Sequence, residues 1–140
     1  KLFTLSAGCL CRPAADENHL TMNDNTDAYL LRIFIGSSDM PDQQLLYEKL
    51  VFQAKNAGMA GVTVTKGIMS FGASSVIHSY KFWEVTDKVP VIVELIDEEQ
   101  KIRSFLDLIR PTLESMKYGC LVTLDRTQVV MYKTGKKRAN

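Results

Sequence analysis

The residues best suited to chemistry lie in one stretch, Thr63–Ser79. It begins with the β-branched composition of a strand and then breaks at Gly67. Glycines allow backbone N–H groups to approach a ligand closely, Ser74 and Ser75 add hydrogen-bond donors, and Lys66 adds a positive charge. Together these groups suit a small anion such as a phosphate.

Two other interpretations of this stretch stay open. Segments rich in glycine and serine are more often connections without a ligand. An enzyme could use His78 as a base and Ser74 or Ser75 as a nucleophile, but no acidic residue in the stretch is placed to orient the histidine. We therefore expect His78 to form hydrogen bonds in a loop, and we expect that the protein is not an enzyme.

The composition argues against several classes of protein. The 140 residues carry 17 Lys and Arg against 16 Asp and Glu, so the net charge of +1 predicts no bulk attraction to nucleic acid or to an anionic membrane. No apolar run approaches the ~18 residues of a spanning helix, so no membrane insertion is expected. Three cysteines do not make a disulfide framework, and Cys120, in apolar company, is expected to be a buried thiol. A cytoplasmic location fits these features best.

The first 28 residues differ from the rest, and we treat them as a tail. Small residues before Cys9 are similar to the end of a secretory or lipoprotein signal, but the apolar part is too short. Cys9 and Cys11 could bind a metal with His19, although two thiols without a second pair make a poor zinc site. Met22 could also be the natural start.

The elements that must position the opening stretch begin with a strand over Tyr29–Ile35, which is apolar on both faces and therefore central in its sheet. Asp42 is expected to cap a helix that runs to Ala57 and stops at Gly58. The positions expected to pack on the sheet have helical spacing: Leu46, Leu50, Ala54 and Ala57.

A second strand is expected over Gly61–Thr65. Residues Thr63–Thr86 could then form one long hairpin with its tip near Gly67–Ser75. An arm of that length would project beyond a small domain. Phe82 and Trp83 would pack either on a neighbouring subunit or in their own core.

A third strand is expected over Val89–Ile96, where Glu94 could pair with Arg32 on a parallel neighbour. Asp97 is expected to accept a hydrogen bond from the Gln100 N–H in a capping box that starts a second helix. The buried face of that helix is predicted from its spacing: Ile102, Phe105, Leu106, Ile109 and Leu113.

The second helix is expected to kink or stop early at Pro111, because proline removes a backbone hydrogen bond. An alternating strand over Cys120–Tyr132 follows. Its predicted core residues are Leu124, Val129, Val130 and Met131.

The order strand, helix, strand, strand, helix, strand predicts an α+β fold. It is the ferredoxin-like βαββαβ sandwich, a four-stranded antiparallel sheet with two helices on one face and a long hairpin after the second strand. The other face, which carries Leu30, Phe34, Ile92 and Ile96, is too apolar to stay exposed. We therefore expect a homo-oligomer that covers it.

Several motifs, in order, resemble one family. They include Leu30-Leu-Arg-Ile-Phe-Ile-Gly36, Gly61-Val-Thr-Val-Thr-Lys-Gly-Ile68 and Phe71-Gly-Ala-Ser-Ser-Val-Ile-His78. Together they resemble the PII-like proteins catalogued as domain of unknown function 190, over about Tyr29–Tyr132. The expected organisation is a tail over residues 1–28, a PII-like domain over residues 29–132 and a basic tail over residues 133–140.

The resemblance implies a homotrimer that binds adenine nucleotides in the clefts between subunits. A loop at Ile68–His78 would dock on a membrane transporter or an enzyme. The implied ligand-binding residues are Thr65, Lys66, Gly67, Phe71, Gly72, Ser74, Ser75, His78 and Gly119.

The chain departs from the PII pattern after the second helix, where PII proteins carry a glycine-rich phosphate-binding loop with a lysine. Only Lys117-Tyr118-Gly119 stands there. This departure favours AMP, ADP or another small anion over a triphosphate, and no cofactor or metal is expected. The alternative function is a ligand-independent adaptor or assembly protein that uses the same loop.

Overall fold

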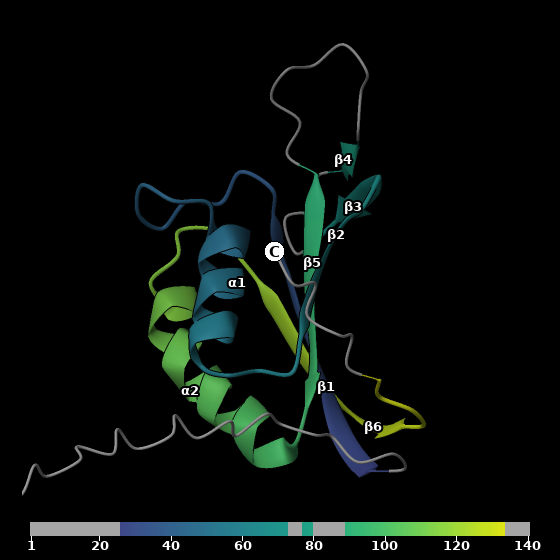
Figure 1. Cartoon of the computed structure of the whole chain (residues 1–140). Helices are drawn as coiled ribbons and strands as arrows, with labels where there is room; N and C mark the ends of the chain where they lie inside the picture. Colours follow the sequence, from purple (N-terminus) through teal and green to yellow (C-terminus); the bar gives the residue numbers. More distant parts are fainter. Residues whose placement is uncertain (1–25, 73–76, 80–88, 134–140) are drawn as a thin grey trace, which may run out of the picture.

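The computed structural model describes residues 26–72, 77–79 and 89–133. Two βαβ-type halves follow each other and form one sheet with two helices, so the predicted ferredoxin-like α+β fold is confirmed (Figure 1). The elements are β1 (Thr26–Gly36), α1 (Leu46–Asn56), β2 (Val62–Lys66), β3 (Met69–Phe71), β4 (Ile77–Ser79), β5 (Pro90–Asp97), α2 (Glu99–Glu114) and β6 (Leu121–Val129).

The main sheet has the strand order β2-β5-β1-β6, and every neighbouring pair is antiparallel. Arg32 lies opposite Glu94, and the Arg32 Nε donates to Glu94 Oε1 at 2.9 Å, so the predicted ion pair is present. The predicted parallel orientation of the two strands is wrong. Two parallel strands need a crossover between them, and the helix α1 provides one between β1 and β2. In the part of the chain that the structure describes, no helix lies between β2 and β5, so the chain turns back and β5 runs antiparallel to both β2 and β1, between which it lies.

Both helices cover the same face of the sheet, and the core lies between them and the central strands (Figure 1). Alternate residues of β1 and β5 face the helices, as the pleat of a strand requires. The buried cluster is Leu31, Ile33, Ile35, Leu46, Leu50, Ala54, Val91, Val93, Leu95, Ile102, Phe105, Ile109 and Leu113.

Helix α1 begins at Leu46, and the predicted cap by Asp42 is wrong. The Asp42 carboxylate instead accepts a hydrogen bond from Lys49 Nζ at 2.6 Å. The predicted stop is correct: Gly58 has φ of 69°, its N–H donates to the Lys55 carbonyl, and the next N–H donates to the Ala54 carbonyl. This is a Schellman ending, which glycine adopts without a steric penalty.

Two further expectations for the helices fail. Ala57 is exposed, because α1 ends before it. The early stop predicted at Pro111 is wrong, since α2 continues to Glu114, while the kink, the other predicted outcome, stays a prediction. Ile109 and Leu113 flank Pro111 and are buried against the sheet, and this packing holds the last turn in place.

The predicted capping box at the start of α2 is also wrong. Asp97 is the last residue of β5 and is fully buried, and Glu98 takes the N-cap position without a side-chain cap. The two oxygens of the Asp97 carboxylate accept hydrogen bonds from the N–H groups of Ala60 and Glu98, each at 2.8 Å. Asp97 therefore joins the end of β5 to the turn before β2.

The predicted hairpin after the second strand is present as the antiparallel pair of β3 and β4. It is not a continuation of β2 as predicted, because β2 ends at Lys66 and the hairpin forms a separate two-stranded sheet. The predicted extension of the hairpin to Thr86 lies outside the described residues. The break has a local cause, because the Gly67 N–H donates to the Pro90 carbonyl at 2.8 Å and a side chain at Gly67 would collide with the Pro90 ring. Phe82 and Trp83 lie outside the described residues.

Strand β6 is an edge strand, and some predictions about its burial fail. Leu124 packs on the core, but Val130 and Met131 lie past the end of β6 and are exposed. Cys120, expected to be buried, is also exposed.

No helix among the described residues is long and apolar enough to cross a membrane. In the same part of the chain no three His, Cys, Asp or Glu side chains are grouped to hold a metal ion. The predicted metal candidates Cys9, Cys11 and His19 lie outside that part.

Candidate functional site

The candidate ligand-binding residues gather at one end of the main sheet, where β1 and β2 end and β5 and β6 begin. Thr65 and Lys66 are the last residues of β2, lie opposite Ile92 and Val91 of β5, and are exposed. Gly67 follows at once, tied to β5 by its backbone hydrogen bond. The backbone at the end of β2 is thus held against β5, and the exposed Lys66 side chain lies beside it.

The small sheet continues from this end and carries the next candidates. Phe71 closes β3 opposite Ile77, and Gly72 follows it. His78 lies in β4 opposite Ser70. Ser74 and Ser75 lie outside the described residues.

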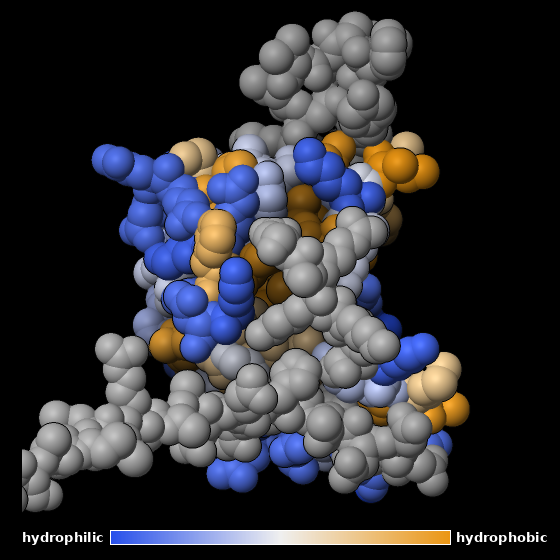
Figure 2. Space-filling model, viewed as in Figure 1, coloured by the Kyte–Doolittle hydropathy of each residue, from blue (hydrophilic) through white to orange (hydrophobic). Residues whose placement is uncertain are grey.

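An exposed apolar patch surrounds β3. Ile68, Met69 and Phe71 are 81%, 62% and 73% exposed, respectively. Figure 2 shows hydrophobic surface gathered at the position of β3 in Figure 1. We call these three residues the β3 patch. Apolar side chains exposed next to one another are typical of a contact surface for another protein.

Gly119 lies at the same end of the sheet but at the opposite edge. It precedes β6 by two residues, whereas Lys66 ends β2, and the strands β5 and β1 separate the two edges. Three strand spacings amount to about 14 Å. The structure therefore brings Thr65, Lys66 and Gly67 together, and it does not bring Gly119 to them within one chain.

The face of the sheet away from the helices combines apolar and charged groups. The register places Leu30, Phe34, Ile92 and Ile96 on this open face, as predicted, and adds Leu121 of β6. Arg32 lies at its centre and bonds Glu94 on one side and Asp125 Oδ2 at 2.8 Å on the other. The sequence prediction missed Asp125, because its partner is set by the register of β6 against β1.

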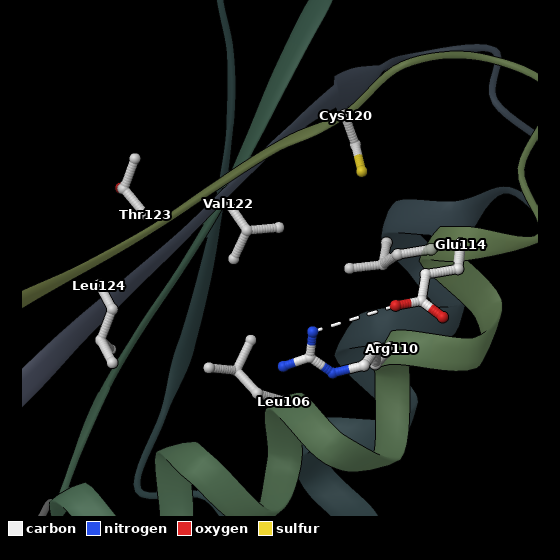
Figure 3. Close-up of a pocket in the computed structure, with 8 residues that line it drawn as sticks. Leu106, Arg110, Glu114, Cys120, Val122, Thr123 and Leu124 are labelled. Carbon is white, nitrogen blue, oxygen red and sulfur yellow. Dashed lines mark ion pairs between the residues drawn. The ribbon is translucent and has the colours of Figure 1, made fainter.

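A groove between α2 and β6 is a second feature that the sequence prediction missed (Figure 3). Its volume is about 450 Å³, and residues of both elements line it: Leu106, Arg110, Leu113, Glu114, Cys120, Val122, Thr123 and Leu124. A signal for the groove was present in the sequence. Cys120, Val122 and Leu124 are spaced two apart, so they share one face of a strand, and Leu106, Arg110 and Leu113 are spaced three or four apart, so they share one face of a helix.

The Cys120 thiol at this groove has a raised pKa. Partial burial of the sulfur is the larger cause, and the nearby carboxylate of Asp39 adds to it. Both effects disfavour the thiolate. The thiol is therefore protonated at neutral pH and a weak nucleophile.

Comparison with known proteins relates most of the chain to one family. The model of a family designated DUF190 and described as uncharacterized ACR matches residues 28–129. A UPF0166 protein from Aquifex aeolicus is 35% identical over 101 residues, which are 72% of this chain and 91% of the relative. A UPF0166 protein from Methanocaldococcus jannaschii is 30% identical over 79 residues, which are 56% of this chain and 72% of the relative.

Two solved structures share the fold. CPII from Thiomonas intermedia K12, described as a nitrogen regulatory PII-like protein bound to ADP, AMP and bicarbonate, has a TM-score of 0.59 at 14% identity, covering 76% of this chain and 91% of CPII. A PII-like signaling protein from Thermus thermophilus has a TM-score of 0.57 at 20% identity, covering 77% of this chain and 94% of that protein. At these identities the likeness establishes the fold.

Proposed function

Because the chain belongs to the DUF190 family and has the fold of PII-like proteins, we propose that it is a regulatory protein that binds an adenine nucleotide between subunits. The nucleotide orders the segment Ile68–His78, and this segment then acts on a partner protein. The protein does no chemistry on the nucleotide.

One observation carries the proposal. The candidate residues lie at the same end of the main sheet, but they are divided between its two edge strands, β2 and β6. Lys66 and Gly67 stand at the β2 edge and Gly119 stands near the β6 edge, about 14 Å away. A phosphate group cannot contact both sets in one chain. When the β2 edge of one subunit faces the β6 edge of the next, both sets line the same cleft.

The open face supports an assembly of this kind. Leu30, Phe34 and Ile92 are half-buried, and Ile96 and Leu121 are exposed, on a face that neither of the two described helices covers. Covering it with other subunits removes apolar surface from water. A ring of three chains with these faces turned to a common axis buries all of them, so we propose a homotrimer.

AMP or ADP is the proposed ligand. The loop after α2 has no glycine-rich segment for a third phosphate, and CPII, which shares the fold, was solved with ADP and AMP. Four residues would contact the phosphate groups: Thr65, Lys66, Gly67 and Gly72. The aromatic ring of Phe71 would contact the nucleotide. Ser74, Ser75 and His78 would complete the segment that the ligand orders.

The β3 patch is the proposed contact for the partner, which could be a membrane transporter or an enzyme. It lies next to Lys66 in the sequence, so ordering of the segment by a phosphate would change how Ile68, Met69 and Phe71 are presented.

Calorimetry with ADP and AMP tests the role of Lys66. A charge-assisted hydrogen bond contributes about 1.5–3 kcal/mol, so Lys66→Ala should weaken binding by roughly ten- to a hundredfold. Lys55→Ala, which removes an exposed lysine from the end of α1, is the matched control and should bind as the parent does. Full affinity in Lys66→Ala would remove Lys66 from the site. Absence of binding in the parent chain would favour the adaptor function.

A further inference from the structure

The groove between α2 and β6 lies on the helix-covered side of the sheet, whereas the open face lies on the other side. In Figure 3 the side chains of Val122 on β6 and of Cys120 just before it point toward α2, and the Arg110 guanidinium on α2 points back into the space between them. Thr123 points away from it. At about 450 Å³ the groove falls within the range of roughly 300–1,000 Å³ that small-molecule sites occupy.

Most residues that line the groove are apolar, and its two charged residues, Arg110 and Glu114, lie together on α2. Leu106, Leu113, Val122 and Leu124 form the apolar part. Arg110 Nη1 lies 4.0 Å from Glu114 Oε1, a separation that allows an ion pair but exceeds a hydrogen bond. The Arg110 side chain is 62% exposed, so its donors are accessible to a ligand.

We propose that this groove binds a small amphipathic carboxylate, whose apolar body lies against the leucine and valine side chains and whose carboxylate accepts hydrogen bonds from Arg110. A planar guanidinium binds a carboxylate through two parallel hydrogen bonds, which the present pair with Glu114 does not make. Glu114 is 69% exposed and can turn to solvent as the ligand enters. The protonated Cys120 thiol does not repel the anion.

Straight-chain carboxylates are suitable probes of the full-length protein. Titrations with butanoate, hexanoate and octanoate, followed by calorimetry, should show an affinity that rises about fourfold for each added methylene while the chain fills the apolar walls. Heptylammonium has the same seven-carbon alkyl chain with the opposite charge and should bind more weakly than octanoate. Equal affinity for the two ions would overturn the role given to Arg110.

Substitutions at three residues of α2 should have different effects on the affinity for octanoate. Arg110→Gln should weaken octanoate binding by about two- to fivefold, the range expected for an ion pair this exposed. Glu114→Gln removes the competing carboxylate and should strengthen it by about twofold. Arg103→Gln is the control, because Arg103 pairs with Glu99 and does not line the groove. The proposal fails if the first two variants move the affinity in the same direction.

The Cys120 thiol reports where the probe binds. In a protein with Cys9→Ser and Cys11→Ser, octanoate should slow alkylation of Cys120 by iodoacetamide, with half the effect at the calorimetric Kd. Cys120→Phe should fill the groove and abolish binding, while Lys66→Ala, which tests the nucleotide cleft, should leave it unchanged. Binding without protection of Cys120, or no binding by the parent chain, would overturn the proposal.

Discussion

Replacing Asp97 with asparagine should destabilise the fold more than any surface charge would. Asp97 is fully buried, and its carboxylate accepts one hydrogen bond from the Ala60 N–H and another from the Glu98 N–H. Lys101 Nζ lies 3.6 Å from Asp97 Oδ1, within ion-pair range but too far for a hydrogen bond. Asparagine keeps the shape of this group but has one acceptor oxygen and no charge.

The magnitude follows from the contacts that are lost. In Asp97→Asn the new amide would accept from one of the two N–H groups and turn its own NH2 toward the other, which leaves that buried donor unsatisfied. A hydrogen bond to a charged group contributes about 1.5–3 kcal/mol, and an orphaned buried donor costs about 1–3 kcal/mol. With the ammonium of Lys101 also unpaired, we expect a loss of about 3 kcal/mol.

Urea unfolding followed by far-ultraviolet circular dichroism measures this loss. With a slope of about 1.5 kcal/mol per molar urea, the midpoint of Asp97→Asn should fall by about 2 M at unchanged slope. Asp107→Asn on the exposed face of α2 is the control and should change stability by less than about 0.5 kcal/mol. A loss below about 1 kcal/mol in Asp97→Asn would refute the assigned role.

Three further predictions concern the glycines and the thiol. Gly67→Ala should cost about 1–3 kcal/mol in urea unfolding, because its Cβ would lie 2.7 Å from Pro90 Cγ, whereas Gly72→Ala faces open space and should be nearly neutral. Gly58→Ala should cost about 1–2 kcal/mol by the same measurement, since φ is 69° there although no atom stands in the way, and Gly58→Asn should cost less. In a protein with Cys9→Ser and Cys11→Ser, alkylation of Cys120 should accelerate at a higher pH than in the urea-unfolded chain, because the folded thiol has a raised pKa. The raised pKa of Cys120 also stabilises the folded state at pH values below the ordinary thiol pKa, and this stabilisation is lost as the pH rises through the pKa of the folded protein. Matching titration curves of the thiol in the folded and unfolded protein would contradict the prediction.

The sequence was informative where one physical rule acted alone. Alternation in β1 and β5 grouped Leu30, Phe34, Ile92 and Ile96 on one face of the sheet, because successive side chains of a strand point to opposite faces. The ending of α1 at Gly58 followed from the freedom of glycine to adopt positive φ. The pairing of Arg32 with Glu94 followed from the tendency of opposite charges to face each other on neighbouring strands.

It failed where two rules competed for the same residue. Asp97 stands in the sequence where a helix cap is expected, but its carboxylate accepts a hydrogen bond from the Ala60 N–H. Ala60 comes near Asp97 only when the chain folds. Pro111 should break a helix, yet burial of its neighbours outweighs one lost backbone bond. Cys120 looked like a core residue, but it lies just before β6, at the exposed edge of the sheet.

The candidate site was predictable only in part, for a geometric reason. Lys66 and Gly67 could be placed together because they follow one strand. The distance of Gly119 from them depends on the strand order β2-β5-β1-β6, which no local pattern encodes. The groove between α2 and β6 depends in the same way on which strand lies at the edge.

Native mass spectrometry of the protein titrated with ADP tests the central claim most directly, because it counts nucleotides on each oligomer. A site built between subunits predicts trimers that carry up to three ADP molecules and monomers that carry none. ADP bound to monomers with the same affinity, or trimers that carry no ADP at saturating concentrations, would contradict the account.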